Sequence, residues 1–243
     1  MRTLLILTGH SKGLGKAIFD RFLMEDSTQI VAVSRTSLEL ENSRVHELAL
    51  DLSDLAALES SLPKIFSDGE FDRYILINNA GWIGDVKPIG KLNPKGIKEV
   101  MNLNLLAPIT LCNAFVKNYQ ENKGQKIIIN ISSGAAKKPL AGWGEYCSSK
   151  AGLEMFSKVA GEELRNKGFS VFSLAPGIVD TAMQGEIRNA EPEDFPALDR
   201  FVQYKTEGLL STAEEVAEKI LHLINHPEKY VDVVQDVRQF ELD

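Results

Sequence analysis

Residues 4–15, LLILTGHSKGLG, join an apolar run directly to a turn that contains three glycines. Continuous apolar character is typical of a parallel strand that is covered on both faces. Glycines in such a turn permit positive φ, let a pyrophosphate approach the backbone and leave the N–H groups of the next helix facing the anion. The spacing is G-x-x-x-G-x-G rather than the general G-x-G-x-x-G. The stretch therefore predicts a dinucleotide site, with a tight strand–helix turn that binds nothing as the alternative.

The rest of the chain repeats this alternation of short apolar runs and helical patterns. The expected strands are 4–8, 30–33, 45–50, 74–78, 126–131, 170–175 and 230–234. The expected helices are 15–24, 55–66, 108–119, 146–167 and 213–225. Such alternation implies right-handed crossovers and a parallel sheet. The predicted class is α/β: a doubly wound Rossmann fold with a seven-stranded parallel sheet and helices on both faces.

The longest stretch without an expected strand runs from residue 181 to residue 210. Loops of that length are commonly lids or binding segments. No shift in composition and no Pro/Gly-rich linker divides the chain. We therefore expect one domain over residues 1–243, with a substrate lid around 181–210.

Composition excludes several classes of function. The chain has 243 residues, of which 44% are hydrophobic and 25% charged, and a formal net charge of -7. That charge disfavours a general attraction to nucleic acid or to an anionic membrane. The first apolar run is too short for a secretory segment, and no later run looks long enough to span a bilayer. Two cysteines, Cys112 and Cys147, suit a reducing cytoplasm. His222 and His226 stand four apart, but the glutamate of H-E-x-x-H is missing, so we expect no metal.

The glycine turn also satisfies a hydrolase pattern. Residues 9–13, GHSKG, match the G-x-S-x-G nucleophile elbow of α/β-hydrolases. The elbow serine normally follows a strand deep in the sheet, with an oxyanion hole from an earlier strand–helix loop. Only one expected strand precedes Ser11, so the context disfavours this interpretation.

The choice of cofactor depends on the end of the second strand. A carboxylate about 20 residues beyond the glycines takes the adenosine ribose hydroxyls and favours NAD. This chain has Ser34, Arg35 and Thr36 at that place and no acid before Glu39. A guanidinium suits a phosphate, and Lys12 adds a second positive charge. The prediction is NADPH/NADP+, although Arg35 alone could be an exposed loop residue.

A tyrosine and a lysine carry the predicted chemistry. Tyr146 and Lys150 are four residues apart, so on a helix they share one face. A tyrosine pKa of about 10 is too high for proton exchange near neutrality, and a nearby ammonium lowers it. The hydroxyl of Ser133, thirteen residues upstream, could hold a substrate oxygen. By itself the pair could equally be a half-buried ring and a solvated amine.

Together with the glycine turn, these residues resemble the short-chain dehydrogenase/reductase family over nearly the whole chain. The run Asn78–Gly81 matches a family element that lines the cofactor, and Asn104 matches its catalytic asparagine. The pair at 51–52 matches residues at the adenine end, and 176–181 matches the segment that holds the nicotinamide carboxamide. The family's offset between serine and tyrosine selects Ser133 over the adjacent Ser132.

The resemblance implies three sets of site residues. The implied catalytic residues are Asn104, Ser133, Tyr146 and Lys150. The implied cofactor-binding residues are Gly9, Ser11, Lys12, Gly13, Leu14, Gly15, Ser34, Arg35, Thr36, Asp51, Leu52, Asn79, Ala80, Gly81, Tyr146, Lys150, Pro176, Gly177, Val179 and Thr181. The expected substrate pocket contains Ser133, Ala135, Trp143, Tyr146 and Met183, with Trp82 and Leu140 nearby.

Within the family, residues 133–139, 142–143 and 34–36 resemble the sepiapterin reductase-like group, and in it the bacterial benzil reductases that form (S)-benzoin. This implies an NADPH-dependent reductase of a small carbonyl compound, here an aromatic α-diketone such as benzil. The alternatives are a 3-oxoacyl or pteridine ketone reductase and a non-catalytic NADP-sensing module. The helices expected at 108–119 and 146–167 resemble those of the family's dimer interface, so we expect a homodimer.

Overall fold

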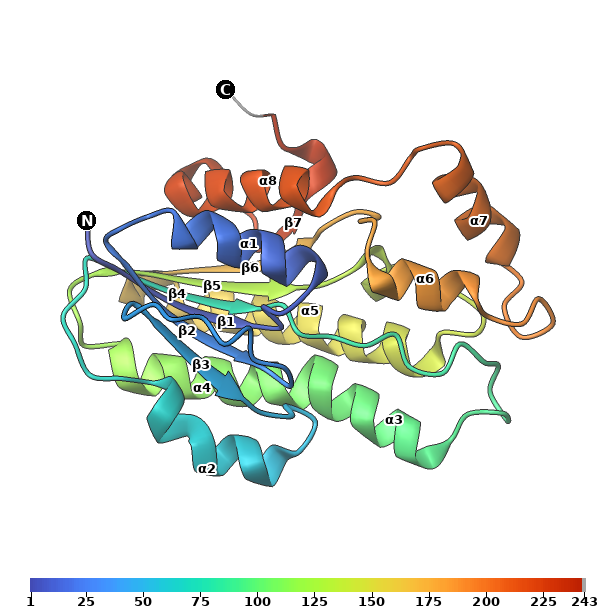
Figure 1. Cartoon of the computed structure of the whole chain (residues 1–243), viewed down its shortest axis with the longest axis horizontal. Helices are drawn as coiled ribbons and strands as arrows, with labels where there is room; N and C mark the ends of the chain where they lie inside the picture. The colour runs from blue at the N-terminus through green and yellow to red at the C-terminus, as the bar shows by residue number, and fades with distance from the viewer. Residues whose placement is uncertain (242–243) are drawn as a thin grey trace.

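A computed structural model describes residues 1–241, and its centre is a seven-stranded parallel sheet. The strand order is β3-β2-β1-β4-β5-β6-β7 (Figure 1). Successive strands are added outward from β1 toward one edge up to β3, and from β4 onward toward the other edge, so the order switches between β1 and β4. The strands are β1 Thr3–Thr8, β2 Thr28–Ser34, β3 Val45–Ala49, β4 Arg73–Asn78, β5 Gln125–Ile131, β6 Phe169–Ala175 and β7 Val234–Asp236. The predicted fold class is confirmed.

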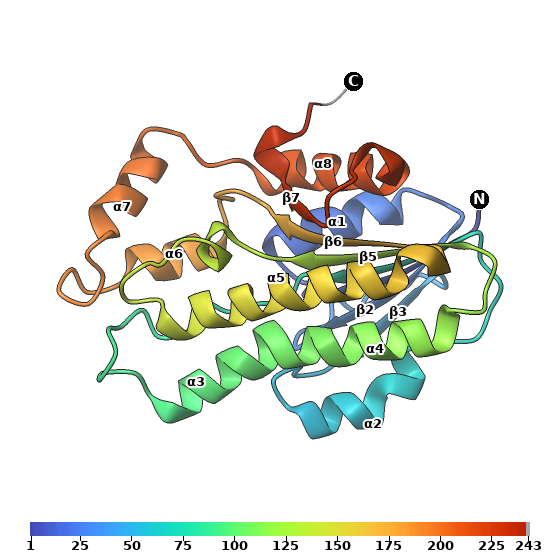
Figure 2. The same cartoon turned by 180° about the vertical axis from the view of Figure 1, so that it is seen from behind.

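Helices cover both faces of the sheet, as Figures 1 and 2 show from opposite sides. The helices are α1 Gly13–Leu23, α2 Leu55–Ile65, α3 Pro94–Met101, α4 Ala107–Tyr119, α5 Gly144–Leu164, α6 Ala182–Arg188, α7 Leu198–Thr206 and α8 Ala213–Asn225. On one face lie α1 and α8, and on the other lie α2, α4 and α5. Leu5 and Leu7 of β1 pack in the first layer, and Leu4 and Ile6 in the second. Both faces are buried, which explains why the run has no polar alternation.

The sequence prediction found the second half of one long helical stretch, expected at 108–119, and missed its first half. Asn93 caps α3 by accepting a hydrogen bond from the Lys95 N–H, and Pro94 occupies the first turn, where its missing N–H costs nothing. A π-helix, Asn102–Leu106, then joins α3 to α4 without a break. Asn and Leu alternate over residues 102–105, a pattern that does not match the 3.6-residue period of a regular helix.

This stretch, Pro94–Tyr119, is also long and apolar enough to cross a membrane by length and composition. Its most apolar window has a mean hydropathy of 1.3, and 44% of that window is buried inside the fold. A core helix passes the same test, so the stretch is weak evidence for a membrane span. The sequence expectation that no later run has the necessary length was wrong here, because residues 94–106 were not recognised as helical.

Two further segments differ from the prediction. The last strand is Val234–Asp236 rather than 230–234, because Pro227–Lys229 forms a short 3-10 helix and Tyr230 packs on the ring of Phe240 instead. The segment 181–210 contains no strand, but it carries α6 and α7. Both helices lie beyond the carboxyl ends of the central strands (Figure 1).

Candidate active site

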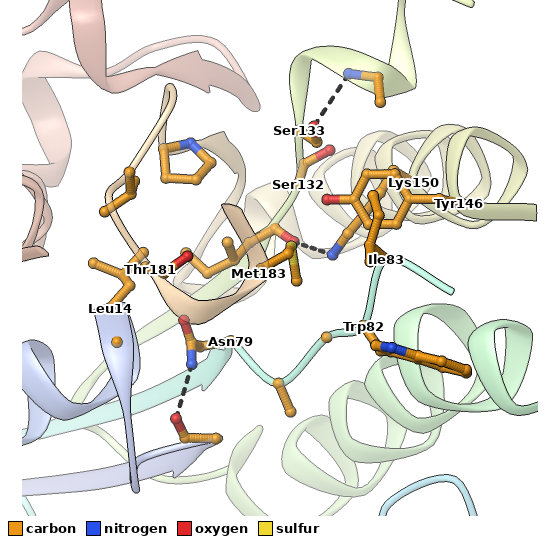
Figure 3. A pocket seen from close by; sticks show the side chains of 18 of the residues that line it. Leu14, Asn79, Trp82, Ile83, Ser132, Ser133, Tyr146, Lys150, Thr181 and Met183 are labelled. Atoms are coloured by element: carbon orange, nitrogen blue, oxygen red, sulfur yellow. Dashed lines mark hydrogen bonds between the residues drawn. The ribbon is translucent and has the colours of Figure 1, made fainter. Parts of the chain in front are cut away.

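A cleft of about 940 Å³ runs along the carboxyl ends of the strands. Parallel α/β sheets bind their ligands at this edge, where the strand order reverses. All of the predicted cofactor residues line it: Gly9, Ser11, Lys12, Gly13, Leu14, Gly15, Ser34, Arg35, Thr36, Asp51, Leu52, Asn79, Ala80, Gly81, Tyr146, Lys150, Pro176, Gly177, Val179 and Thr181. Figure 3 shows the two ends of the cleft, with Leu14, Asn79 and Thr181 at one and Ser133, Tyr146 and Lys150 at the other.

The glycine turn has the geometry of an anion cradle. Gly9 and Gly13 have φ of 73° and 57°, values that favour glycine. A Cβ on Gly15 would stand 2.0 Å from the Gly9 carbonyl oxygen, so only glycine lets α1 start this close to β1. The Asn79 amide donates to the carbonyls of Thr8 and Gly9, at 3.0 and 3.2 Å, and fixes the turn from the side.

The start of α1 is free to bind an anion. No side chain caps the helix, and its first turn contains no acidic residue. The uncapped N–H groups and the helix dipole together favour a phosphate at this place. The turn therefore fits the pyrophosphate of a dinucleotide.

The end of the cleft beside β2 carries positive charge. Lys12 and Arg35 are both exposed and both line the cleft. Neither forms an ion pair with any residue in the described range 1–241. Ser34 is buried, and its hydroxyl donates to the Thr36 carbonyl at 2.6 Å, which fixes the end of β2.

Helix α5 brings the predicted acid and its amine into the other end of the cleft. Tyr146 is 6% exposed and Lys150 is 4% exposed. The pair is therefore not the half-buried ring and solvated amine that the sequence left open as an alternative. Ser133 stands at the end of β5, opposite Tyr146. Its hydroxyl oxygen accepts a hydrogen bond from the Ala135 N–H at 3.2 Å, which leaves the hydroxyl proton for another partner.

The electrostatics of this pair differ from the sequence expectation. Burial raises the pKa of Tyr146 to about 12, and the Ser133 side chain offsets only part of that rise. Burial also lowers the pKa of Lys150 to about 8. The Lys150 ammonium donates to the Ile131 carbonyl at 2.7 Å and lies 5.9 Å from the centre of the Tyr146 ring. The pKa of Tyr146 is therefore raised and not lowered as expected, and Ser133 rather than Lys150 is the group that offsets part of the effect of burial.

Asn104 does not line the cleft but lies directly behind it, in the π-helix Asn102–Leu106. Its side chain donates to the Trp82 carbonyl at 2.8 Å and to the Ser149 hydroxyl at 3.2 Å, and accepts from the Trp82 N–H at 2.9 Å. A Cβ built on Gly81 would be 3.4 Å from the Asn104 amide oxygen and 3.6 Å from the Lys150 nitrogen. Asn104 and Lys150 therefore approach the same point of the backbone.

The substrate end of the cleft is aromatic. Of the predicted substrate residues, Ser133, Ala135, Trp143, Tyr146 and Met183 line it, and so do Trp82 and Leu140. The Trp143 ring stands edge-on to Tyr146, with centroids 5.5 Å apart, and stacks on Phe195. Phe201 and Tyr204 of α7 extend this cluster. Sequence analysis placed the segment 181–210 at the substrate pocket but did not name Phe195, Phe201 and Tyr204, although several aromatic side chains in a strand-free segment were a usable signal.

Comparison with known proteins assigns the chain to a family. The family pattern described as short chain dehydrogenase matches residues 3–192. The chain belongs to the short-chain dehydrogenase family. It is therefore an oxidoreductase of the alcohol–carbonyl type that uses a nicotinamide cofactor, and the hydrolase interpretation of Ser11 was wrong.

Individual members of the family are similar over almost the full chain. A benzil reductase ((S)-benzoin forming) of Bacillus cereus is 43% identical over 235 residues, which cover 92% of this chain and 94% of that protein. A sepiapterin reductase of Meriones unguiculatus is 33% identical and covers 90% of each chain. Among solved structures, a short chain dehydrogenase/reductase of Saccharomyces cerevisiae superimposes with a TM-score of 0.82 at 25% identity, covering 98% of this chain and 97% of its own.

Proposed function

We propose that the protein is an NADPH-dependent carbonyl reductase that reduces an aromatic α-diketone such as benzil to (S)-benzoin. The observation that carries this proposal is the buried Tyr146 phenol between Ser133 and Lys150, at the aromatic end of a dinucleotide-shaped cleft. The 43% identity to a benzil reductase supports the choice of substrate.

The catalytic roles follow from the contacts of each side chain. When bound, NADPH supplies the hydride that reaches the carbonyl carbon. The Ser133 hydroxyl would donate a hydrogen bond to the carbonyl oxygen, where negative charge develops, and would keep its own proton. Tyr146 would give its proton to the same oxygen; its pKa of about 12 keeps the phenol protonated at neutral pH, although it makes the phenol a weaker acid than free tyrosine.

Lys150 and Asn104 restore the proton. The Lys150 ammonium, held by the Ile131 carbonyl, lies beside Tyr146 and would bind the nicotinamide ribose of the cofactor. The Asn104 amide oxygen and the Lys150 nitrogen approach the same point at Gly81, where one water could join them. A proton then returns to Tyr146 through Lys150 without opening the cleft to bulk solvent.

The cofactor is assigned as NADPH from the charges at the adenosine end. Arg35 and Lys12 supply two cations without ion-pair partners in residues 1–241, next to the place of the adenosine ribose. Asp51 also lines the cleft, and its Oδ1 accepts from the N–H and the hydroxyl of Ser53, at 2.9 and 2.8 Å. A 2′-phosphate would find the two cations of Arg35 and Lys12, and β2 ends without the carboxylate that favours NAD.

The aromatic cluster favours a substrate with flat, apolar ends. Trp143 and Tyr146 stand edge-on, and Met183 adds a polarizable, adaptable wall. An aromatic diketone places one carbonyl at Ser133 and a ring against these side chains. A pteridine ketone is the second candidate, because the sepiapterin reductase relative also covers 90% of the chain.

The test follows NADPH consumption at 340 nm with benzil, a sepiapterin-type pteridine and a 3-oxoacyl thioester, and product chirality by chiral chromatography. We expect benzil to give the highest kcat/KM and (S)-benzoin as product. A higher kcat/KM for the pteridine would move the assignment to the second candidate. If NADPH binds but no carbonyl is reduced, the chain is a cofactor-sensing module.

We also propose that the protein is a cytoplasmic homodimer. Both cysteines are free, in keeping with a reducing compartment. Leu106, at the end of the π-helix just before α4, is 40% exposed, and Met155 and Val159 of α5 are 60% and 47% exposed. Helices α4 and α5 lie side by side on one face of the sheet (Figure 2). These helices form the outer layer of the sheet, and a second copy packed on them would bury these side chains.

A further inference from the structure

Glu47 is a nearly buried carboxylate in β3, the edge strand of the sheet. It pairs with Ala32 of β2, and its side chain is only 9% exposed. A carboxylate in such a place needs partners, because an unpaired buried charge is costly. Its partners come from two different segments of the chain, neither of which belongs to β3.

The first partner belongs to the glycine turn. His10 is completely buried, and its Nε2 lies 2.7 Å from a Glu47 carboxylate oxygen. An ionised carboxylate only accepts, so Nε2 carries the proton and donates it. The His10 ring also packs against Phe19 of α1, with centroids 5.4 Å apart. Glu47 is therefore tied to the turn between β1 and α1 through the buried side chain of His10.

The other partners belong to the loop 35–44, which leaves β2 after Ser34 and returns as β3. The N–H groups of Leu38 and Leu40 donate to Glu47 at 2.7 and 3.2 Å, and the Ser37 hydroxyl donates at 3.0 Å. Burial alone would raise the pKa of Glu47, but these bonds and His10 outweigh burial and lower it to about 2. The carboxylate is therefore ionised at every physiological pH.

One residue of this loop has an unfavourable backbone conformation. Glu39 has φ of 54°, in the left-handed region that non-glycine residues rarely adopt. Its N–H donates to the Ser37 hydroxyl at 3.0 Å, and that hydroxyl is itself bound to Glu47. Strained backbone of this kind persists where its surroundings hold it. In this loop, Glu47 is the group that holds both flanks of the strained residue.

Arg35 is the first residue of this loop. It is exposed, it lines the cleft, and it has no ion-pair partner among the residues described. An arginine on a free loop would lose much side-chain and backbone entropy when it binds a phosphate, whereas a fixed loop loses less.

We propose that Glu47 is a positioning residue for the cofactor, because it ties the loop 35–44 to His10 and so holds Arg35 beside the glycine turn for a phosphate on the adenosine ribose. This inference rests on the proposed preference for NADPH. It assigns selectivity partly to a residue that touches no part of the cofactor. Such a residue would not be found by searching for cations near the site.

Because Glu47 is charged, the loss of its charge and the loss of its hydrogen bonds change phosphate binding in opposite directions. A carboxylate near a phosphate site repels the ligand, so simple removal of its charge would strengthen phosphate binding. Loss of the hydrogen bonds that fix the loop would weaken phosphate binding instead. The two effects have opposite signs, and the variant Glu47→Gln distinguishes them without any change in side-chain size.

The experiment measures binding, without turnover, by fluorescence titration of NADPH and NADH against the wild type and Glu47→Gln. Glu41→Gln is the matched control, because Glu41 is exposed in the same loop and makes no side-chain hydrogen bond in the described structure. We expect Glu47→Gln to bind NADPH roughly tenfold more weakly, with NADH within about twofold of the wild type. Glu41→Gln should keep the wild-type ratio of the two affinities. Hydrogen exchange should become faster at the Leu38 and Leu40 amides in Glu47→Gln alone.

Ser37→Ala removes one of the four bonds and guards against a folding failure of Glu47→Gln. It should weaken NADPH binding in the same direction by a smaller factor. Unchanged or tighter NADPH binding in Glu47→Gln, or an equal loss for NADPH and NADH, would overturn the inference. A wild type that binds NADH as tightly as NADPH refutes the proposed cofactor choice itself, a result that the wild-type titration reveals before any variant is made.

Discussion

Trp143 and Phe195 are stacked face to face, with ring centroids 5.4 Å apart and planes inclined by only 8°. Trp143 is the residue before α5, three positions from Tyr146, and Phe195 lies between α6 and α7. Lys91 adds an ion pair to Asp194, the neighbour of Phe195. The stack therefore joins the segment 181–210, which we expect to be a lid, to the helix that carries the proposed acid.

Loosening this stack should affect the substrate and not the cofactor. Phe195→Leu removes the ring and is expected to cost about 1–2 kcal/mol of stability and to raise the KM for benzil roughly tenfold. The affinity for NADPH should stay unchanged. Phe115→Leu is the control, because Phe115 is an equally buried residue of α4 away from the cleft. It should lower the melting temperature by a similar amount and leave the KM for benzil as it is. An equal rise in KM in both variants would mean that the stack has no specific role.

Tyr146→Phe removes the proposed proton donor and keeps the ring. We expect kcat for benzil to fall about 10²–10⁴-fold, the usual contribution of a general acid, while NADPH still binds. Tyr204→Phe removes another phenol that lines the same cleft and should retain nearly full activity. Stopped-flow absorbance at 340 nm measures both. Activity of Tyr146→Phe close to that of the wild type would place the acid elsewhere.

The affinity for NADPH should fall as the pH rises through about 8. Burial lowers the pKa of Lys150 to about 8, so the ammonium is present below that pH and is lost above it. Tyr146, with a pKa of about 12, does not titrate in this range. Fluorescence titrations of NADPH from pH 6 to 10 should show one midpoint near 8, and Tyr146→Phe should show the same midpoint. If the midpoint disappears in Tyr146→Phe, the tyrosine and not the lysine is the titrating group.

Glu47 should stabilise the fold in a pH-dependent way. Its pKa is lowered from 4.5 to about 2 in the folded protein, so the unfolded chain binds more protons between these values. The stabilisation is complete above pH 4.5 and is lost as the pH falls through 2, and it amounts to on the order of 2–3 kcal/mol. Urea unfolding of wild type and Glu47→Gln at pH 7 and pH 3 measures it, with Glu41→Gln as control. A difference in unfolding free energy that does not shrink at low pH would contradict the assignment.

Met155→Lys should separate the proposed dimer. The side chain is 60% exposed on α5, and a charge there would be buried without a partner in a dimer through α4 and α5. Size-exclusion chromatography with light scattering should show a dimer for the wild type and a monomer for this variant. Val231→Lys, at a residue that is 91% exposed outside these helices, should remain dimeric. A monomeric wild type would contradict the proposal at once.

The fold was predictable because its signals are local. β1 is apolar on both faces, and the glycine turn follows it without interruption, so periodicity and turn chemistry agree. The places of the site residues followed from a family resemblance, and the cleft contains nearly all of them. Their electrostatics did not follow, since the opposed pKa shifts of Tyr146 and Lys150 arise from burial that no spacing reveals.

The parts that escaped prediction depend on contacts between distant segments. Glu47 appears in the sequence as an ordinary strand carboxylate, and only the fold brings His10 to it across 37 positions of the chain. Phe195 joins Trp143 for the same reason. The α3 helix was missed because the irregular turn at 102–106 breaks the 3.6-residue period on which helix recognition rests.

That irregular turn, Asn102–Leu106, gives the helical stretch from 94 to 119 one residue more than a regular spiral would need. Each residue of a regular helix advances the direction of its side chain by about 100°. Deleting one residue there would make the helix regular. It would also rotate every residue on the amino-terminal side of the deletion about the helix axis and break the hydrogen bonds between the Asn104 amide and Trp82. Such a protein would keep a regular helix from 94 to 118 but would lose the placement of Asn104 that the proposed mechanism needs.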